Sequence, residues 1–214
     1  LMRWTALRAQ VRAELVLTLR RGESVLVTIG IPAGVLVFFA TVKLVDTGFR
    51  HDVDFLLPGV LALGVMSTAM VSLGIATGFE RRYLVLKRLG ATPLGRPTLI
   101  GAKILAVLCI ELVQVALLVA VATLLGWDQW AALPAAIPLV LLGSLAFGGI
   151  GLAMAGMLRA ELTLALANAV YLVLLLVGDM AVPLDRLPRP VAAVAELLPA
   201  AALARGLRGV LAPG

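Results

Sequence analysis

Side chains that could do chemistry are few in this sequence, and they stand far apart. His51 is the only histidine, which excludes an HExxH zinc site. The sequence has no Gly-x-Ser-x-Gly turn to carry a nucleophilic serine, and its apolar runs hold no pair of carboxylates at helical spacing. It also lacks any Gly-Lys dipeptide, which the phosphate-binding loop of ATPases requires. We therefore expect no catalytic residue and no metal site in this chain.

Three polar residues interrupt long apolar runs: Glu111, Gln114 and Asn168. A charge at the depth of Glu111 in a membrane costs about 2.5–3.5 kcal/mol, so its carboxyl should face protein or water, or be protonated. Gln114 lies one turn further along the same helical face. These residues either line a substrate route or make hydrogen bonds between helices, which are worth about 0.6 kcal/mol on average.

The composition requires a bilayer around these residues. Hydrophobic residues make up 62% of the 214 residues and charged residues 14%, against about 45–50% and 25% in globular proteins. The apolar runs are continuous and do not alternate, which favours helices over a barrel. Because a helix needs about 20 apolar residues to cross the hydrocarbon core, the sequence predicts an all-α integral membrane protein, a polytopic helical bundle. Its five predicted spans are 24–42, 55–79, 104–127, 129–158 and 162–178.

Lys and Arg residues gather on one side of these predicted spans. The stretch before the first span and the loops after the second and fourth spans are basic, whereas the opposite loops hold only Lys43 and Arg50. The positive-inside rule therefore places the N-terminus in the cytoplasm of a multi-pass protein of the cell (plasma) membrane. The net charge of +6 then reflects topology, and we expect no nucleic-acid partner.

Both ends of the chain carry apolar segments that are not ordinary spans. Residues 1–22 place Trp4, Leu7 and Leu15 at helical spacing on one face, which favours an N-terminal helix in the inner interface over a plain basic leader. The segment 183–211 is rich in proline and alanine. It predicts an outer re-entrant hairpin, two short helices broken at a proline, that lies on or dips into the outer leaflet. We expect a further span to follow it.

The connection between the second and third spans is longer than a hairpin needs. Glu80 suits the positive end of a helix dipole, and Lys87 and Arg88 suit the negative end. Gly90 is placed to end that helix. The pattern predicts, over residues 80–97, a short helix parallel to the membrane surface and a turn. A docking element is favoured over a solvated loop without a partner.

This connection resembles that of the type-2 ABC exporter permease family, and in particular the antibiotic-resistance and polyketide-drug permeases of actinobacteria. Family members carry a Glu soon after the second span, a Leu-rich basic helix, a Thr-Pro-Leu turn and a Gly-x-Lys before the third span. In this sequence the Glu is Glu80, the Thr-Pro-Leu turn is residues 92–94 and the Gly-x-Lys is residues 101–103. Tyr83 stands near where many relatives have Gly. The resemblance extends more loosely to the N-terminal helix, the spans and the outer hairpin, and the family expects six spans.

The resemblance implies one ABC type-2 transmembrane domain over residues 1–214. It implies an ATP-driven exporter of an amphipathic drug-like or lipid-like substrate, in which a separate ABC ATPase subunit binds ATP and Mg. It also implies a second permease copy or a paralogue as dimer partner. The residues of the implied coupling helix that would contact the ATPase are Glu80, Arg81, Arg82, Lys87 and Arg88.

Two alternatives from other classes stay open. A secondary transporter would need ion- or proton-handling groups within the membrane, and Glu111 is nearly alone there. A membrane assembly or scaffold protein without ATPase coupling is not excluded by any feature of the sequence.

Overall fold

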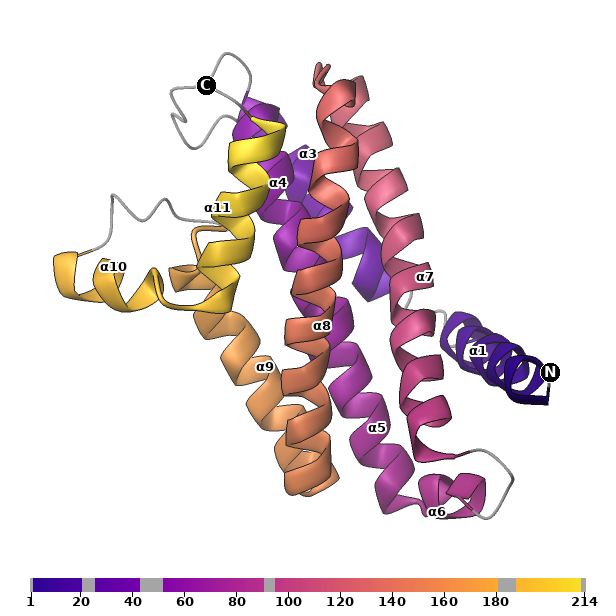
Figure 1. Cartoon of the computed structure of the whole chain (residues 1–214). Coiled ribbons are helices and arrows are strands. Elements are labelled where there is room, and N and C mark those ends of the chain that lie inside the picture. Colours follow the sequence, from indigo (N-terminus) through magenta and orange to yellow (C-terminus); the bar gives the residue numbers. More distant parts are fainter. Residues whose placement is uncertain (1, 21–25, 43–51, 91–94, 181–187, 213–214) are drawn as a thin grey trace.

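Helices make up nearly all of the part of the chain that can be described in the computed structural model (Figure 1). The described residues are 2–20, 26–42, 52–90, 95–180 and 188–212. No strand occurs among them, which confirms the predicted all-α class. The elements are α1 (Met2–Arg20), the π-helix η1 (Leu26–Gly30), α3 (Ile31–Val42), α4 (Asp52–Val65), the π-helix η2 (Met66–Ser72), α5 (Leu73–Arg82), α6 (Val85–Gly90), α7 (Arg96–Leu124), the 3-10 helix η3 (Trp130–Ala132), α8 (Leu133–Met157), α9 (Ala160–Val177), α10 (Arg189–Ala195) and α11 (Pro199–Leu211).

Four helices in the described part are long and apolar enough to cross a membrane: Val53–Arg82, Arg96–Leu124, Trp130–Met157 and Ala160–Val177. The pair α10 and α11, bent by 83°, would make a fifth if counted as one broken span. Thr28–Val42 is a shorter apolar helix, and residues 24 and 25 of the predicted first span lie outside the described residues. These helices confirm a polytopic membrane protein.

The boundary of the short helix between the second and third spans differs from the prediction. The sequence suggested that this helix starts at Glu80, and this is wrong, because α5 continues to Arg82 and α6 begins only at Val85. This last turn of α5 is held against α7, α8 and α9 by Glu80, Arg81 and Arg82. Residues 91–94, which carry the predicted Thr-Pro-Leu turn, lie outside the described part. The third span begins earlier than predicted, at Arg96.

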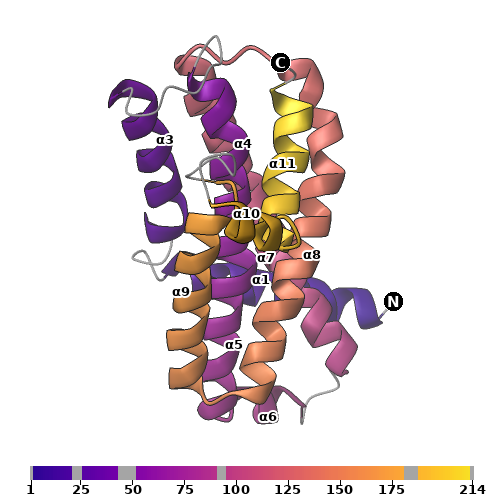
Figure 2. The same ribbon diagram turned by 90° about the vertical axis from the view of Figure 1, so that its left-hand side faces the viewer.

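The helix formed by α4, η2 and α5 is the centre of the bundle. It is the most deeply buried of the four long helices, and it contacts α3, α7, α8, α9 and α11. In both views α1 lies across the bundle beside α7, while α9 rises only to the middle of the bundle (Figures 1 and 2). There α10 lies crosswise, and α11 continues to the upper end.

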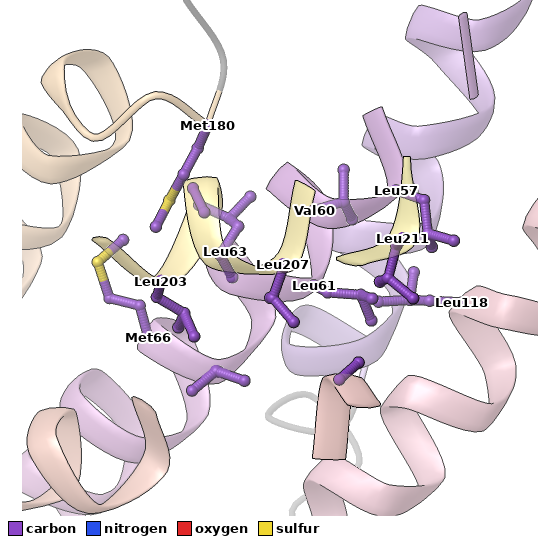
Figure 3. Packing of buried hydrophobic residues seen from close by; sticks show 14 of the residues in the cluster. Leu57, Val60, Leu61, Leu63, Met66, Leu118, Met180, Leu203, Leu207 and Leu211 are labelled. Atoms are coloured by element: carbon purple, nitrogen blue, oxygen red, sulfur yellow. The ribbon is translucent and has the colours of Figure 1, made fainter. Parts of the chain in front are cut away.

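The C-terminal helix α11 is a part of the core. In Figure 3, Leu207 and Leu211 lie against Leu57 and Leu61 of α4, with Leu118 of α7 beside them, and all five side chains are buried. The outer hairpin predicted over 183–211 therefore packs into the bundle through its second helix. Its break comes directly before the Pro199 that starts α11, because proline suits the first turn of a helix.

An ion pair fixes the start of this hairpin to α11. Arg208 donates hydrogen bonds to a carboxylate oxygen of Asp179 and, over 2.8 Å, to its main-chain oxygen. The same guanidinium lies 4.1 Å from the centroid of the Phe55 ring of α4, a cation–π contact. Asp179 has φ 58, a left-handed conformation that few residues other than glycine adopt. The pair thus holds a sharp turn after α9 against the core.

The crossing of α8 with η2 and α5 depends on glycines. A Cβ at Gly151 would stand 2.6 Å from the main-chain oxygen of Met70, and a Cβ at Gly74 would stand 3.0 Å from that of Gly151. Small residues allow helix backbones to approach this closely. The π-helical turn η2 lies at this crossing, and such turns occur often at functional sites. Gly143, Gly148 and Gly151 of α8 therefore pack against other helices of this same chain.

We expect Gly151→Ala to destabilise the bundle, because the added methyl meets backbone that cannot move aside as a side chain would. Overpacking of this kind costs about 1–3 kcal/mol. Gly149→Ala, on the same helix with open space at its Cβ, is the matched control. Thermal unfolding in detergent should show a lower midpoint for Gly151→Ala alone. Equal midpoints for the two variants would contradict the close crossing.

Candidate functional site at the α6 end of the bundle

The turn between α5 and α6 carries an exposed apolar surface, which we call the apolar tip and define as Tyr83, Leu84 and Val85. Their exposed fractions are 63%, 55% and 36%. The turn is closed by main-chain hydrogen bonds from Leu84 N to Arg81 O and from Arg88 N to Leu84 O, 3.2 and 3.1 Å long. The tip therefore lies at the end of α5, where the described part of the chain leaves much of it exposed.

Leu84 is held in an unfavourable backbone conformation, with φ 60. For a residue with a bulky side chain this costs on the order of 1–3 kcal/mol and persists only where the surroundings determine it. Here the Tyr83 ring stacks on Phe79 of α5 with 6.1 Å between centroids, and the Arg82 guanidinium lies 5.8 Å from the Tyr83 centroid. The turn is thus preformed and presents its leucine outward.

A buried ionic cluster, which we call the Lys103 cluster, lies behind this turn and consists of Lys103, Glu14 and Glu80. The Lys103 ammonium of α7 is 2.9 Å from Oε1 of Glu14 in α1 and 2.7 Å from Oε2 of Glu80 in α5. Only 3% of the Lys103 side chain is exposed. Because a buried charge is costly without partners, this ammonium ties α1, α5 and α7 together.

The two arginines after Glu80 bind other helices. Arg81 donates to the main-chain oxygens of Ala155, over 2.8 Å, and of Gly156, which are acceptors left free at the end of α8. A cation at this position also interacts favourably with the negative end of the helix dipole. Arg82 forms an exposed ion pair with Glu161 of α9. The last turn of α5 therefore contacts α7, α8 and α9 through its charged side chains, and Lys103 of α7 extends this set of contacts to α1.

The residues predicted to contact an ATPase are divided by the structure into two groups. Glu80 and Arg81 are engaged with other helices of this chain, whereas Lys87 and Arg88 are exposed on α6. Arg82 is exposed and paired. Sequence reasoning missed the apolar tip, since a positive φ at a leucine leaves no sequence signal. It also missed Glu14, although a lone acid in a strongly basic stretch was visible.

Gln114 lies in the bundle interior and joins three helical elements. Its Nε2 donates to the main-chain oxygen of Thr28 in η1 over 2.7 Å, and its Oε1 accepts from Thr68 Oγ1 of η2 over 3.2 Å. Gly64 makes room for this amide, because a Cβ there would stand 2.6 Å from Nε2. These hydrogen bonds satisfy polar groups that have no water to bind inside the membrane.

Glu111 lies one turn earlier and joins α7 to α8. Ser144 Oγ is within hydrogen-bond reach of both Glu111 Oε2 and the main-chain oxygen of Val140. A hydroxyl has one hydrogen, so both contacts are hydrogen bonds only if the carboxyl contributes a second one. Oε1 of Glu111 is buried without a hydrogen-bond partner among the described residues. The Glu111 side chain therefore lies in the bundle interior and contacts α8 there.

Asn168 stands apart from these two residues. It is exposed on α9, where its Nδ2 donates to the main-chain oxygen of Leu164 over 2.8 Å. It borders a mostly apolar cavity of about 660 Å³ between α1, η1, η2, α5 and α7, whose charged lining residues are Glu14 and Lys103. Glu111 and Gln114 are not among the described lining residues. A role for the three residues in a substrate route stays a prediction.

The comparisons with known proteins agree with this architecture. The sequence model of the ABC-2 type transporter family matches residues 5–212, a range that reaches from α1 to the end of α11. A search of the curated proteins finds no match.

We expect Lys103→Met to destabilise the protein strongly, because it leaves two largely buried carboxylates without their cation. Breaking a buried pair in this way costs about 3–5 kcal/mol. Lys87→Met removes the same charge from an exposed position of α6 and serves as the control. Denaturant unfolding in detergent micelles checks both variants. A stability of Lys103→Met equal to that of Lys87→Met would show that the cluster does not join the helices.

We expect Glu111→Gln to keep the stability of the bundle, because an amide can both donate to and accept from Ser144. Glu111→Leu should lose about 1–3 kcal/mol, the cost of leaving a buried polar group without its partner. The same unfolding measurement compares the two variants. If Glu111→Gln were as unstable as Glu111→Leu, the carboxyl would serve another purpose than joining α7 to α8.

Proposed function

The chain belongs to the ABC-2 type transporter family, and on that premise we propose that it is the permease subunit of an ATP-driven exporter whose ATPase is a separate chain. The family membership makes it a membrane-spanning permease component. We further propose the direction of transport, the class of cargo and the surface on which the ATPase docks.

The observation that carries the proposal is the apolar tip beside the basic helix α6. Tyr83, Leu84 and Val85 are exposed at the end of the bundle, with Lys87 and Arg88 exposed directly after them. Apolar and aromatic anchors inside a charged rim are typical of the energetic centre of a protein interface. The cations would steer and orient an acidic surface of the ATPase. We propose that the ATPase docks on this surface.

The same surface is connected to the rest of the bundle by the charged contacts of α5. Glu80, Arg81 and Arg82 reach α7, α8 and α9, and Lys103 extends the connection to α1. A force applied to α6 would therefore reach four other helices through direct charged contacts, of which those of Lys103 are buried. We propose that Glu80 and Arg81 couple ATP hydrolysis to transport by positioning the docking surface, while α6 itself makes the contact.

This assignment sets the orientation that we propose. The ATPase, with ATP and Mg bound to it, lies in the cytoplasm, so the α6 end and the N-terminus would be cytoplasmic in the cell membrane. The basic residues of the loop between the second and third spans agree with that orientation.

For the cargo we propose an amphipathic drug-like or lipid-like molecule. The cavity beside α1 has a volume of about 660 Å³, within the range of about 300–1,000 Å³ that ligand pockets cover. Its wall is mostly apolar. We further propose that two permeases pair in the membrane, either two copies or this chain with a paralogue, because the outward face of α9 carries exposed Leu166, Leu172 and Leu176 that a partner or lipid must cover.

Leu84→Gly tests the docking surface. Glycine suits the positive φ at this position, so the variant should fold at least as well as the wild type while losing the central apolar contact of the tip. We expect copurification with a coexpressed candidate ABC ATPase to weaken, and stimulation of that ATPase to fall by about tenfold or more, as for the loss of an interface anchor of about 1.4 kcal/mol or more.

The control is Leu197→Gly, which removes an even more exposed leucine from the turn between α10 and α11. It should leave ATPase association unchanged. Normal association and stimulation for Leu84→Gly, with an unchanged unfolding temperature, would place the ATPase contact elsewhere.

A further inference from the structure

A second cavity, which we call the basic groove, lies between α6 and the ends of α5, α7 and α8. Its volume is about 980 Å³. Its floor is apolar and includes Leu86 of α6, Leu99 and Ile100 of α7 and Leu152 of α8. The groove is therefore large enough for part of an amphipathic molecule, and its floor favours a hydrocarbon segment.

The charged residues that line the basic groove are all cations. They are Arg81, Lys87, Arg96 and Lys103, and no carboxylate is among the described lining residues. Arg81 and Lys103 are already engaged, by the end of α8 and by two carboxylates respectively. Lys87 and Arg96 are exposed, so their charges are the ones available to an anion.

Two neutral features add to this preference for an anion. The helix α7 begins at Arg96, after Gly95 in an extended conformation, so its positive dipole end lies at the groove. The Thr77 hydroxyl lines the groove and is buried without a hydrogen-bond partner among the described residues. A phosphate oxygen would accept a hydrogen bond from such a hydroxyl.

The depth of the groove agrees with the headgroup layer of a bilayer. Its inner end is Lys103, which contacts the crosswise helix α1 through Glu14. In both views α6 lies beyond α1, toward the end of the bundle (Figures 1 and 2). A helix such as α1, lying across the bundle, marks the interface plane. The basic groove then extends from that plane toward the aqueous side.

We propose that the basic groove binds one anionic phospholipid, with its phosphate between Lys87 and Arg96 and the first part of an acyl chain on the apolar floor, from which the chain continues inward past α1 into the bilayer. Basic pockets between membrane helices bind anionic headgroups for the same reason. The lipid would connect α6 to α7 and α8, so its presence would stabilise the position of the ATPase docking surface. The lipid site itself needs no ATPase and does not depend on the proposed export function.

Native mass spectrometry of the purified permease, without ATPase, tests this site with dioleoylphosphatidylglycerol and dioleoylphosphatidylcholine. We expect preferential binding of the anionic lipid. Arg96→Gln and Lys87→Gln should each weaken it about fivefold, the factor for about 1 kcal/mol per charge near a membrane surface, and leave phosphatidylcholine binding unchanged. Arg189→Gln removes an exposed arginine from α10 and should have no effect.

Several outcomes would overturn the proposal. Equal binding of the two lipids, or equal losses in Arg96→Gln and Arg189→Gln, would reduce it to bulk attraction. Displacement of the lipid by glycerol 3-phosphate at the same concentration would show a site for a free anion, because the acyl chain would then contribute nothing. Weaker ATPase copurification in Arg96→Gln, with unchanged lipid binding, would assign the groove to the ATPase.

Discussion

The burial of the Lys103 ammonium between two carboxylates is the constraint on which the α6 end of this molecule depends. Its partners Glu14 and Glu80 come from two different helices. In surroundings of low dielectric the three charges can stay buried only while all three helices are in place. The cluster therefore fixes the crosswise helix α1, the long helix α7 and the last turn of α5 at once. The position of the α5–α6 turn follows from it.

A second constraint acts in the bundle interior, where neither water nor lipid can satisfy a polar group. The helix α4–η2–α5 passes through the centre, and its neighbours approach it at glycines, with Gly151 against the main chain of Met70. Gln114 and Glu111 make hydrogen bonds to other helical elements at this level. Close backbone contact and polar pairing thus stabilise the interior together, where apolar attraction between helices is weak in a bilayer.

These two constraints explain how a thin bundle can present a defined surface at its end. The apolar tip is exposed and strained, and it is built on a helix whose last turn is held by α7, α8 and α9. A rigid support allows a partner to bind without ordering the turn first, which lowers the entropic cost of association. The basic groove beside it adds a place where the lipid of the same leaflet can act on the same helix.

The sequence by itself determined the class of this protein, because a composition of 62% hydrophobic residues and continuous apolar runs have one solution in a bilayer. The placement of Lys and Arg predicted an orientation for the same reason, and the motif after the second span pointed to the family. These signals are local, so they can be read one segment at a time.

The tertiary structure alone decided which polar residues meet. Glu80 reads as the start of a helix in the sequence, yet it lies in the last turn of α5, where it pairs with Lys103 of another helix. Asn168 and Glu111 look alike as polar interruptions of apolar runs, but one borders a cavity and the other is closed into the interior. Such pairings depend on side chains far apart in the chain, and no periodicity records them.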